Sequence, residues 1–292
     1  MKDKGKSFVF ETPEGKVEMD FNEVKSLAES GNIDGKYAYG MSLVLGIDTP
    51  ADEEKGYRFL KEAADEGHPE AMLFLVKMFF SGKYTEIDLE KSVEYSKKAI
   101  EAGCEEAKLY LGTAYMDGVC VEQDFSKAAE MFGQAALAGV QEARNSLAYL
   151  YEEGLGVPRD LKKACRLYSI AAKAGNMNAM FRFAVCLETG SGIAKDIVKA
   201  VEWYEKSSEL GDAFAMHRLG VIYSTGLPPI EEDPEKAFNY FLEGALQGFK
   251  DSMDAVSACY EKGYGVEKNS EEAAKWKKFA EAGKDDIVCC FL

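Results

Sequence analysis

The chain has 292 residues, 51 of them Asp or Glu and 35 Lys or Arg, so its formal net charge at pH 7 is −16. This acidity argues against a nucleic-acid binder, which needs a basic surface against the phosphates, and against attachment to anionic lipid by charge. No apolar run approaches the ~20 residues of a membrane span, and the N-terminus lacks the apolar segment of a secretory signal. We therefore expect a cytoplasmic protein whose charge favours basic partners, unless the acids only solvate helix faces.

The seven cysteines show no ligand or disulfide pattern. Their number is odd, there is no C-x-x-C, and only two of them are close together in the sequence. Zinc sites and disulfide frameworks have regular, short spacings. We interpret most of them as small buried hydrophobic residues in a reducing compartment; they are Cys104, Cys120, Cys165, Cys186, Cys259, Cys289 and Cys290.

Residues 1–19 predict a β-hairpin. Two short β-prone stretches, 7–10 and 16–19, flank the sequence Thr12-Pro13-Glu14-Gly15, which has proline and glycine at favoured turn positions. We expect the hairpin to cover the first end of the repeat array that follows, because a terminal repeat cannot bury both of its faces.

A glycine that closes a helix recurs about every 36 residues, which is the signature of a solenoid of helix pairs. It falls at Gly31, Gly67, Gly103, Gly139, Gly175, Gly211, Gly248 and Gly283. Each interval also has a loop glycine followed by an N-cap residue for the next helix, namely Asp52, Asp88, Asp124, Asp160, Asp196, Asp233 or Asn269. The predicted units are a half-repeat helix at 20–34, seven repeats at 35–67, 71–103, 107–139, 143–175, 179–211, 215–248 and 252–283, and a C-terminal capping tail at 284–292.

The first helix of each repeat carries a predicted core stripe. A small residue begins it, and apolar residues follow four and eight positions later, as in Ala71, Leu75 and Phe79. These offsets lie on one helical face. In the second helix, a Lys follows the cap, an apolar residue such as Leu167 lies seven positions past the cap, and alanine pairs such as Ala171-Ala172 complete the stripe. We interpret the aromatic residues at this spacing as core rather than as a ligand box.

The pattern A-x-x-x-L-G-x-x-Y-x-x-G-x-G-V-x-x-D-x-x-K-A-x-x-W-Y-x-x-A-A-x-x-G resembles the Sel-1-like repeat family, which is related to tetratricopeptide repeats. Residues 143–175 match it almost position for position, and the similarity covers roughly 20–287. The resemblance implies an all-α fold, a right-handed α/α superhelical solenoid of antiparallel helix pairs. It also implies an adaptor or scaffold that holds other proteins.

Departures from the pattern are local. Tyr84 replaces the second loop glycine of repeat two, Pro228-Pro229 and one extra residue lengthen the loop of repeat six, and Lys277 replaces a usual tyrosine. Cysteine-rich members of the family have been linked to penicillin binding or hydrolysis. This chain lacks their regular cysteines, so the resemblance does not carry that activity over.

We predict no catalytic, cofactor or metal site. His68 follows a closing glycine, and His217 lies off the core stripe of a first helix. No metal cluster, nucleophile elbow or phosphate loop stands out, and the loop glycine pairs do not follow strands, as nucleotide binding requires. The last residues, starting at Cys289, fit a weak prenylation motif. The alternative is that they begin a further helix, and we do not expect a membrane partner.

The predicted function therefore rests on the surface of the first helices, which line the concave face of such solenoids. Positions two, three, six and nine after the starting small residue point away from the core stripe and include aromatic, arginine and amide side chains suited to binding. We predict a non-enzymatic adaptor that binds a protein or peptide there. The alternatives are ordinary groove lining, an exported bacterial effector or membrane-attached adaptor acting on host proteins, and a β-lactam-binding hydrolase. The candidate residues are Tyr37, Met41, Asn145, Tyr149, Glu152, Phe181, Arg182, Glu188, His217 and Arg218.

Overall fold

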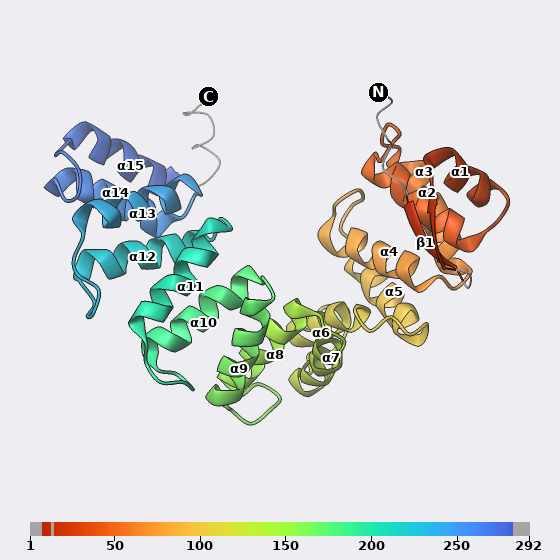
Figure 1. The fold of residues 1–292 in the computed structure, drawn as a ribbon, viewed down its shortest axis with the longest axis horizontal. Helices are drawn as coiled ribbons and strands as arrows, with labels where there is room; N and C mark the ends of the chain where they lie inside the picture. Colours follow the sequence, from red (N-terminus) through yellow and green to blue (C-terminus); the bar gives the residue numbers. More distant parts are fainter. Residues whose placement is uncertain (1–7, 13–14, 283–292) are drawn as a thin grey trace. The chain divides into compact units, whose positions relative to one another are not determined.

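The computed structural model describes residues 8–12 and 15–282, which form fifteen helices and one pair of strands (Figure 1). The predicted all-helical repeat architecture is confirmed. The helices are α1 (Phe21–Glu29), α2 (Ile33–Leu45), α3 (Glu53–Asp65), α4 (Pro69–Ser81), α5 (Leu89–Glu101), α6 (Ala107–Asp117), α7 (Phe125–Leu137), α8 (Gln141–Glu153), α9 (Leu161–Lys173), α10 (Met177–Thr189), α11 (Ile197–Glu209), α12 (Ala213–Thr225), α13 (Pro234–Leu246), α14 (Lys250–Lys262) and α15 (Ser270–Ala282).

Two short strands precede the helices. β1 (Phe8–Thr12) pairs antiparallel with β2 (Gly15–Met19), with Thr12 opposite Gly15. The strands lie where the sequence predicts a hairpin, and the central residues of its turn lie outside the described residues. Asp20 then caps α1 in a reciprocal capping box with Glu23. The role of the hairpin as a cover stays a prediction, as does that of the C-terminal tail, which is not described.

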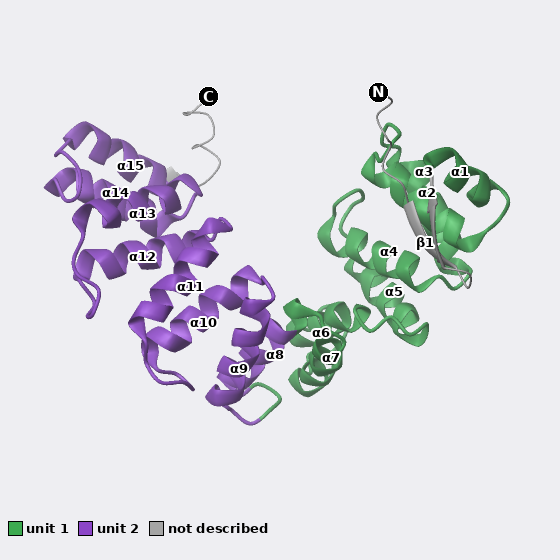
Figure 2. Cartoon of the chain, in the orientation of Figure 1, with its two compact units in different colours: residues 1–143, 155–157 green, residues 144–154, 158–292 purple. Residues whose placement is uncertain are grey.

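The chain divides into two compact units (Figure 2). Unit 1 comprises residues 1–143 and 155–157, and unit 2 comprises residues 144–154 and 158–292. In unit 2, one hydrophobic cluster runs from Ala148 to Ala280. In unit 1, the core includes a cluster around Leu60, Leu75 and Phe79. Within each unit, a helix packs chiefly on the helices next to it in sequence, as expected of stacked repeats.

The core stripe of the first helices is confirmed at its first two positions. The small starting residues and the apolar residues four positions later are buried in all seven repeats. At position eight, Tyr115, Tyr151 and Tyr260 are only half-buried. The Nζ of a lysine lies over two of these rings, 4.0 Å from the Tyr151 centroid for Lys163 and 5.3 Å from the Tyr115 centroid for Lys127. A half-buried aromatic ring at this position therefore makes a cation–π contact with a lysine through its exposed face.

The second-helix stripe is displaced by one residue from the prediction. The side chain seven positions past the cap is half-buried in most repeats, as Leu167 and Trp203 illustrate. The residue after it is the one that fills the core, since Tyr168 is 1% exposed and Tyr204 is 0% exposed. The two positions lie side by side on the helix, and the periodicity alone did not decide which of them faces the core.

The predicted N-caps are confirmed in the second helices. In each of the first six repeats the cap aspartate accepts a hydrogen bond from the backbone N–H three residues later, at 2.9–3.1 Å. Asn269 does the same in the seventh repeat. The N–H of each cap residue also donates to the carbonyl at position eight of the preceding helix, at 2.8–3.0 Å. The C-terminal end of each loop is therefore held against the first helix of its repeat.

A second loop glycine lets a loop contact the helix of the preceding repeat. Gly192 has a φ of +75°, and a Cβ there would lie 2.0 Å from the carbonyl oxygen of Leu161. Gly156 and Gly265 approach the starts of α7 and α13 in the same way. In repeats one to three the equivalent residues are Asp48, Tyr84 and Cys120, which also have positive φ. Positive φ is thus common to these loops, and the closest approach occurs where glycine is present.

We expect Gly192→Ala to destabilise the protein more than Gly175→Ala. Gly175 also has positive φ, but a Cβ there meets nothing within 4 Å, so its replacement costs only the left-handed backbone penalty of about 1–2 kcal/mol. At position 192, overpacking adds roughly 1–3 kcal/mol. Urea unfolding followed by circular dichroism measures both variants. Equal midpoints would contradict the role given to close approach.

Candidate partner-binding surface

The ten candidate residues divide between the units. Tyr37 and Met41 lie on α2 in unit 1, and the other eight lie on α8, α10 and α12 in unit 2. Most are half-buried, Arg182 is exposed, and Glu188 is buried. We refer to positions two, three, six and nine of the first helices as the first-helix face.

Tyr37 belongs to a small polar cluster in unit 1. Its ring lies 4.6 Å from the ring of His68, whose Nδ1 accepts a hydrogen bond from the Ala71 N–H and so caps α4. Burial, together with the nearby charge of Glu70, raises the pKa of Tyr37. In the sequence His68 is notable only for following a closing glycine, and its function as a cap was not recognised there.

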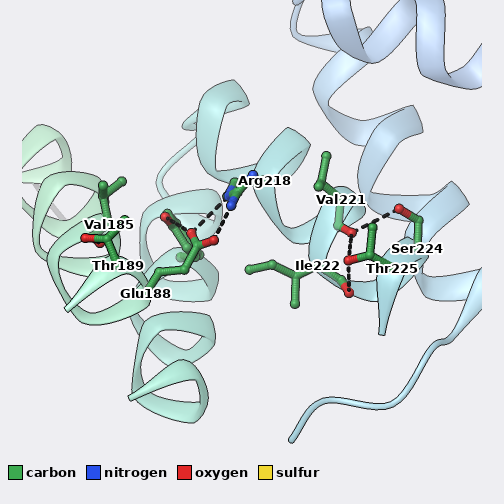
Figure 3. A network of polar contacts seen from close by, with 9 residues as sticks. Val185, Glu188, Thr189, Arg218, Val221, Ile222, Ser224 and Thr225 are labelled. Carbon is green, nitrogen blue, oxygen red and sulfur yellow. Dashed lines mark hydrogen bonds and ion pairs between the residues drawn. The ribbon is translucent and has the colours of Figure 1, made fainter. Parts of the chain in front are cut away.

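Glu188 does not point away from the core, so this part of the prediction is wrong. Its side chain is 6% exposed. Its carboxylate accepts hydrogen bonds from the Tyr204 hydroxyl at 2.8 Å, from Arg218 Nε at 2.9 Å and from Arg218 Nη2 (Figure 3). Burial alone would raise the pKa of Glu188, but the hydrogen bonds from Arg218 and Tyr204 outweigh it and hold the pKa below its usual value.

Arg218 is therefore a structural residue as well as a surface residue. Its charge compensates a buried carboxylate that would otherwise be costly. The preceding repeat has part of the same arrangement, since the Tyr168 hydroxyl donates to Glu152 at 2.7 Å. In both repeats the Glu precedes the Tyr by sixteen residues. That recurring spacing was readable in the sequence, and Arg182 follows Glu152 by thirty residues as Arg218 follows Glu188. The two arginines differ in their surroundings, since the Arg182 side chain is exposed.

Aromatic rings connect two candidate residues in unit 2. The ring of Phe181 lies 6.2 Å from that of Phe214, the ring of Phe214 lies 4.7 Å from that of Phe249, and the ring of Phe249 lies 5.3 Å from that of His217. Phe214 is 60% exposed. The sequence analysis missed Phe214 and Phe249 because they lie next to the first-helix face rather than on its four positions. We call Phe181, Phe214, Phe249 and His217 the aromatic cluster.

His217 anchors the aromatic cluster to the core. Its Nδ1 lies 3.1 Å from the Ser252 hydroxyl, and its ring packs on Phe241 at 5.4 Å. Burial lowers the pKa of His217 more than the charge of Asp251 raises it. The imidazole is therefore neutral at pH 7, and it contributes a ring and one hydrogen bond rather than a charge.

Asn145 and Tyr149 are half-buried on α8. Among the described side chains, Asn145 Oδ1 is the one buried polar atom without a hydrogen-bond partner. A buried amide oxygen in this state costs roughly 1–3 kcal/mol. It marks an energetically unfavourable point in the candidate surface.

The described residues contain no group of three His, Cys, Asp or Glu side chains arranged to hold a metal ion. No helix in this part of the chain combines the length and apolar character needed to cross a bilayer. Cys165, Cys186 and Cys259 are buried free thiols, as predicted, whereas Cys120 is exposed. Cys289 lies outside the described residues.

We expect Glu188→Ala to lower the free energy of unfolding by about 2 kcal/mol, because it leaves the buried Tyr204 hydroxyl without its acceptor. Arg182→Ala, on the exposed arginine of the same face, should change it by less than ~0.5 kcal/mol. The folded-state pKa of Glu188 is lowered, so its contribution is complete above the unfolded pKa of ~4.3 and is lost as the pH falls through the folded pKa. Urea unfolding of both variants at pH 7 and pH 3 measures this. A loss that is equally large at pH 3 would contradict the assignment.

Comparison with known proteins gives the chain its family. Seven consecutive stretches match the Sel1 repeat, at residues 33–68, 69–104, 105–140, 141–176, 178–212, 213–249 and 250–283. No curated protein matches the chain significantly.

Two solved structures share its fold. A protective antigen of uropathogenic Escherichia coli strains with an SLR fold is 30% identical over 92% of this chain, with a TM-score of 0.73, and this chain spans 58% of the length of that one. A Sel1 repeat protein from Oxalobacter formigenes is 26% identical over 92% of this chain and 78% of its own, with a TM-score of 0.70. Proteins of this type are generally non-enzymatic and mediate protein–protein interactions. The chain belongs to the Sel1 repeat family.

Proposed function

We propose that this protein is a non-enzymatic adaptor that binds another protein, or an extended peptide, along its first-helix face. The observation that carries the proposal is the aromatic cluster of unit 2. A phenylalanine that is 60% exposed and in contact with a second ring, as Phe214 is with Phe249, is an unusual feature for a surface that only meets water. Aromatic residues of this kind supply much of the binding energy at protein interfaces.

The two candidate arginines of unit 2 indicate which charged residue would take part in binding. Arg182 follows Phe181 directly on α10 and is exposed, whereas the guanidinium of Arg218 is engaged by Glu188. An exposed planar guanidinium is suited to a carboxylate or a backbone carbonyl of a partner. Of the two arginines, Arg182 is therefore the one we assign to partner recognition.

The test compares the wild-type protein with a double variant, Arg182→Glu with Phe214→Ser, in quantitative pull-downs from the cells that produce it. We expect the double variant to lose its partner by about tenfold or more, because truncating an interface aromatic residue commonly costs ~2 kcal/mol. The matched control is Val198→Ser, an exposed position on α11 that is 46% accessible. Circular dichroism of the three proteins verifies equal helicity.

The control must hold the partner as well as the wild type does. A partner retained equally by all three proteins would contradict a binding site at the aromatic cluster. A partner found only in a second organism's lysate, and absent from that of the producing cells, would favour the exported alternative over a cytoplasmic adaptor.

A further inference from the structure

A small open pocket lies in unit 1 between α4 and α6, the first helices of the second and third repeats. Phe80 on α4 and Tyr110 on α6 form its sides, and their rings meet edge to face at 5.2 Å. Leu89 and the buried Val93 of α5 line it from below the two helices. The first-helix positions involved, nine on α4 and three and six on α6, belong to the first-helix face defined above.

The pocket is mainly apolar, and two of the hydroxyl groups that line it, those of Thr113 and Ser92, already donate to backbone carbonyls. Thr113 donates to the Leu109 carbonyl at 3.0 Å, and Ser92 donates to the Val76 carbonyl at 3.3 Å. Phe80 remains 40% exposed. What the pocket presents to a ligand is therefore mainly carbon, which favours an apolar side chain over a polar one.

The size of the pocket matches one side chain. Its cavity volume is about 50 Å³, far below the range for small-molecule sites. On the same measure one water needs about 10–15 Å³, so the pocket has room for a few heavy atoms. Two of its walls belong to neighbouring repeats, so a segment lying across the first helices would pass over its mouth. An apolar anchor residue that fills a pocket is the arrangement found at interface hot spots.

Negative charge surrounds the mouth. Asp117, at the end of α6, is the one charged residue among those lining the pocket. Burial and the charges of Glu106 and Glu142 raise the pKa of Tyr110 to about 12, so these two carboxylates also act on this position. Glu106 is paired with Lys77 Nζ at 2.8 Å, which reduces its share of this potential. Unit 1 as a whole has 28 Asp and Glu against 16 Lys and Arg. A cation next to the apolar anchor would meet a complementary potential.

We propose that this pocket binds the side chain of a large apolar residue, Leu, Met or Phe, in a partner peptide that has a Lys or Arg beside it to pair with Asp117. The proposal rests on the adaptor function and names the class of partner. It makes the pocket a specificity site, since the apolar walls select the anchor and Asp117 selects the neighbouring charge.

The test selects displayed random 12-residue peptides on the immobilised full chain. We expect enriched peptides to share a large apolar residue adjacent to Lys or Arg. Thr113→Trp, which fills the pocket, should weaken their binding roughly tenfold or more. The matched control is Ala258→Trp, at the same helix position in repeat seven, where Ala258 borders open space between α14 and α15. This control should bind the peptides as the wild type does.

A second variant keeps the proposal testable if Thr113→Trp does not fold. Asp117 is exposed at the last turn of α6, where a lysine is favourable to the helix dipole. Selection on Asp117→Lys should therefore replace the basic neighbour by Asp or Glu while keeping the apolar anchor. Three outcomes would overturn the proposal. Peptides selected on Asp117→Lys could still prefer a basic neighbour, the enriched peptides could bind Thr113→Trp as tightly as the wild type, or the wild type could enrich no peptide above a bare-surface control. The adaptor function is judged separately, by the Arg182 and Phe214 double variant.

Discussion

The N-cap residue of each second helix, aspartate in six repeats and asparagine in the seventh, is the residue on which the rest of the repeat depends. Its side chain accepts from the third backbone N–H of the helix, and its own N–H donates to the carbonyl at position eight of the helix before it, as in Asp196 with Lys199 and Leu187. One residue thus ends the loop, starts the second helix and ties it to the first. Because the two helices leave this point in a fixed relation, their small residues meet and the first-helix face is presented to solvent.

The fold was predictable from the sequence because its signals are local and repeated. Caps, closing glycines and the first core stripe each recur seven times, so chance agreement at one position does not mislead. Glu188 was not placed correctly because a carboxylate next to the buried Leu187 can point to solvent or into the core. Which of the two it does depends on its partners Tyr204 and Arg218, sixteen and thirty residues further on. The aromatic cluster and the pocket beside Tyr110 likewise need side chains from several helices, which periodicity in one helix cannot bring together.

The two units, each considered by itself, offer different chemistry to a partner. Unit 1 combines most of the excess negative charge with an apolar pocket that presents few free polar groups. Unit 2 exposes Phe214, which contacts Phe249, and Arg182, and it uses its other candidate arginine to neutralise Glu188. Repeats with the same backbone therefore differ in what they can recognise, because the core positions are held constant while the first-helix face varies.

The loop of the sixth repeat shows how little the helices depend on loop length. It contains Pro228-Pro229 and one more residue than the other loops, yet Asp233 N–H still reaches the Tyr223 carbonyl at 2.9 Å, and its side chain still caps α13. The hydrogen bond fixes the two loop ends, so extra chain between them adds only a small closure entropy. The segment 227–232, which has Pro228 where other loops have the closely packed glycine, is therefore a position where this architecture can tolerate inserted sequence, whether gained in evolution or added as a tag, while the helices on either side keep their register.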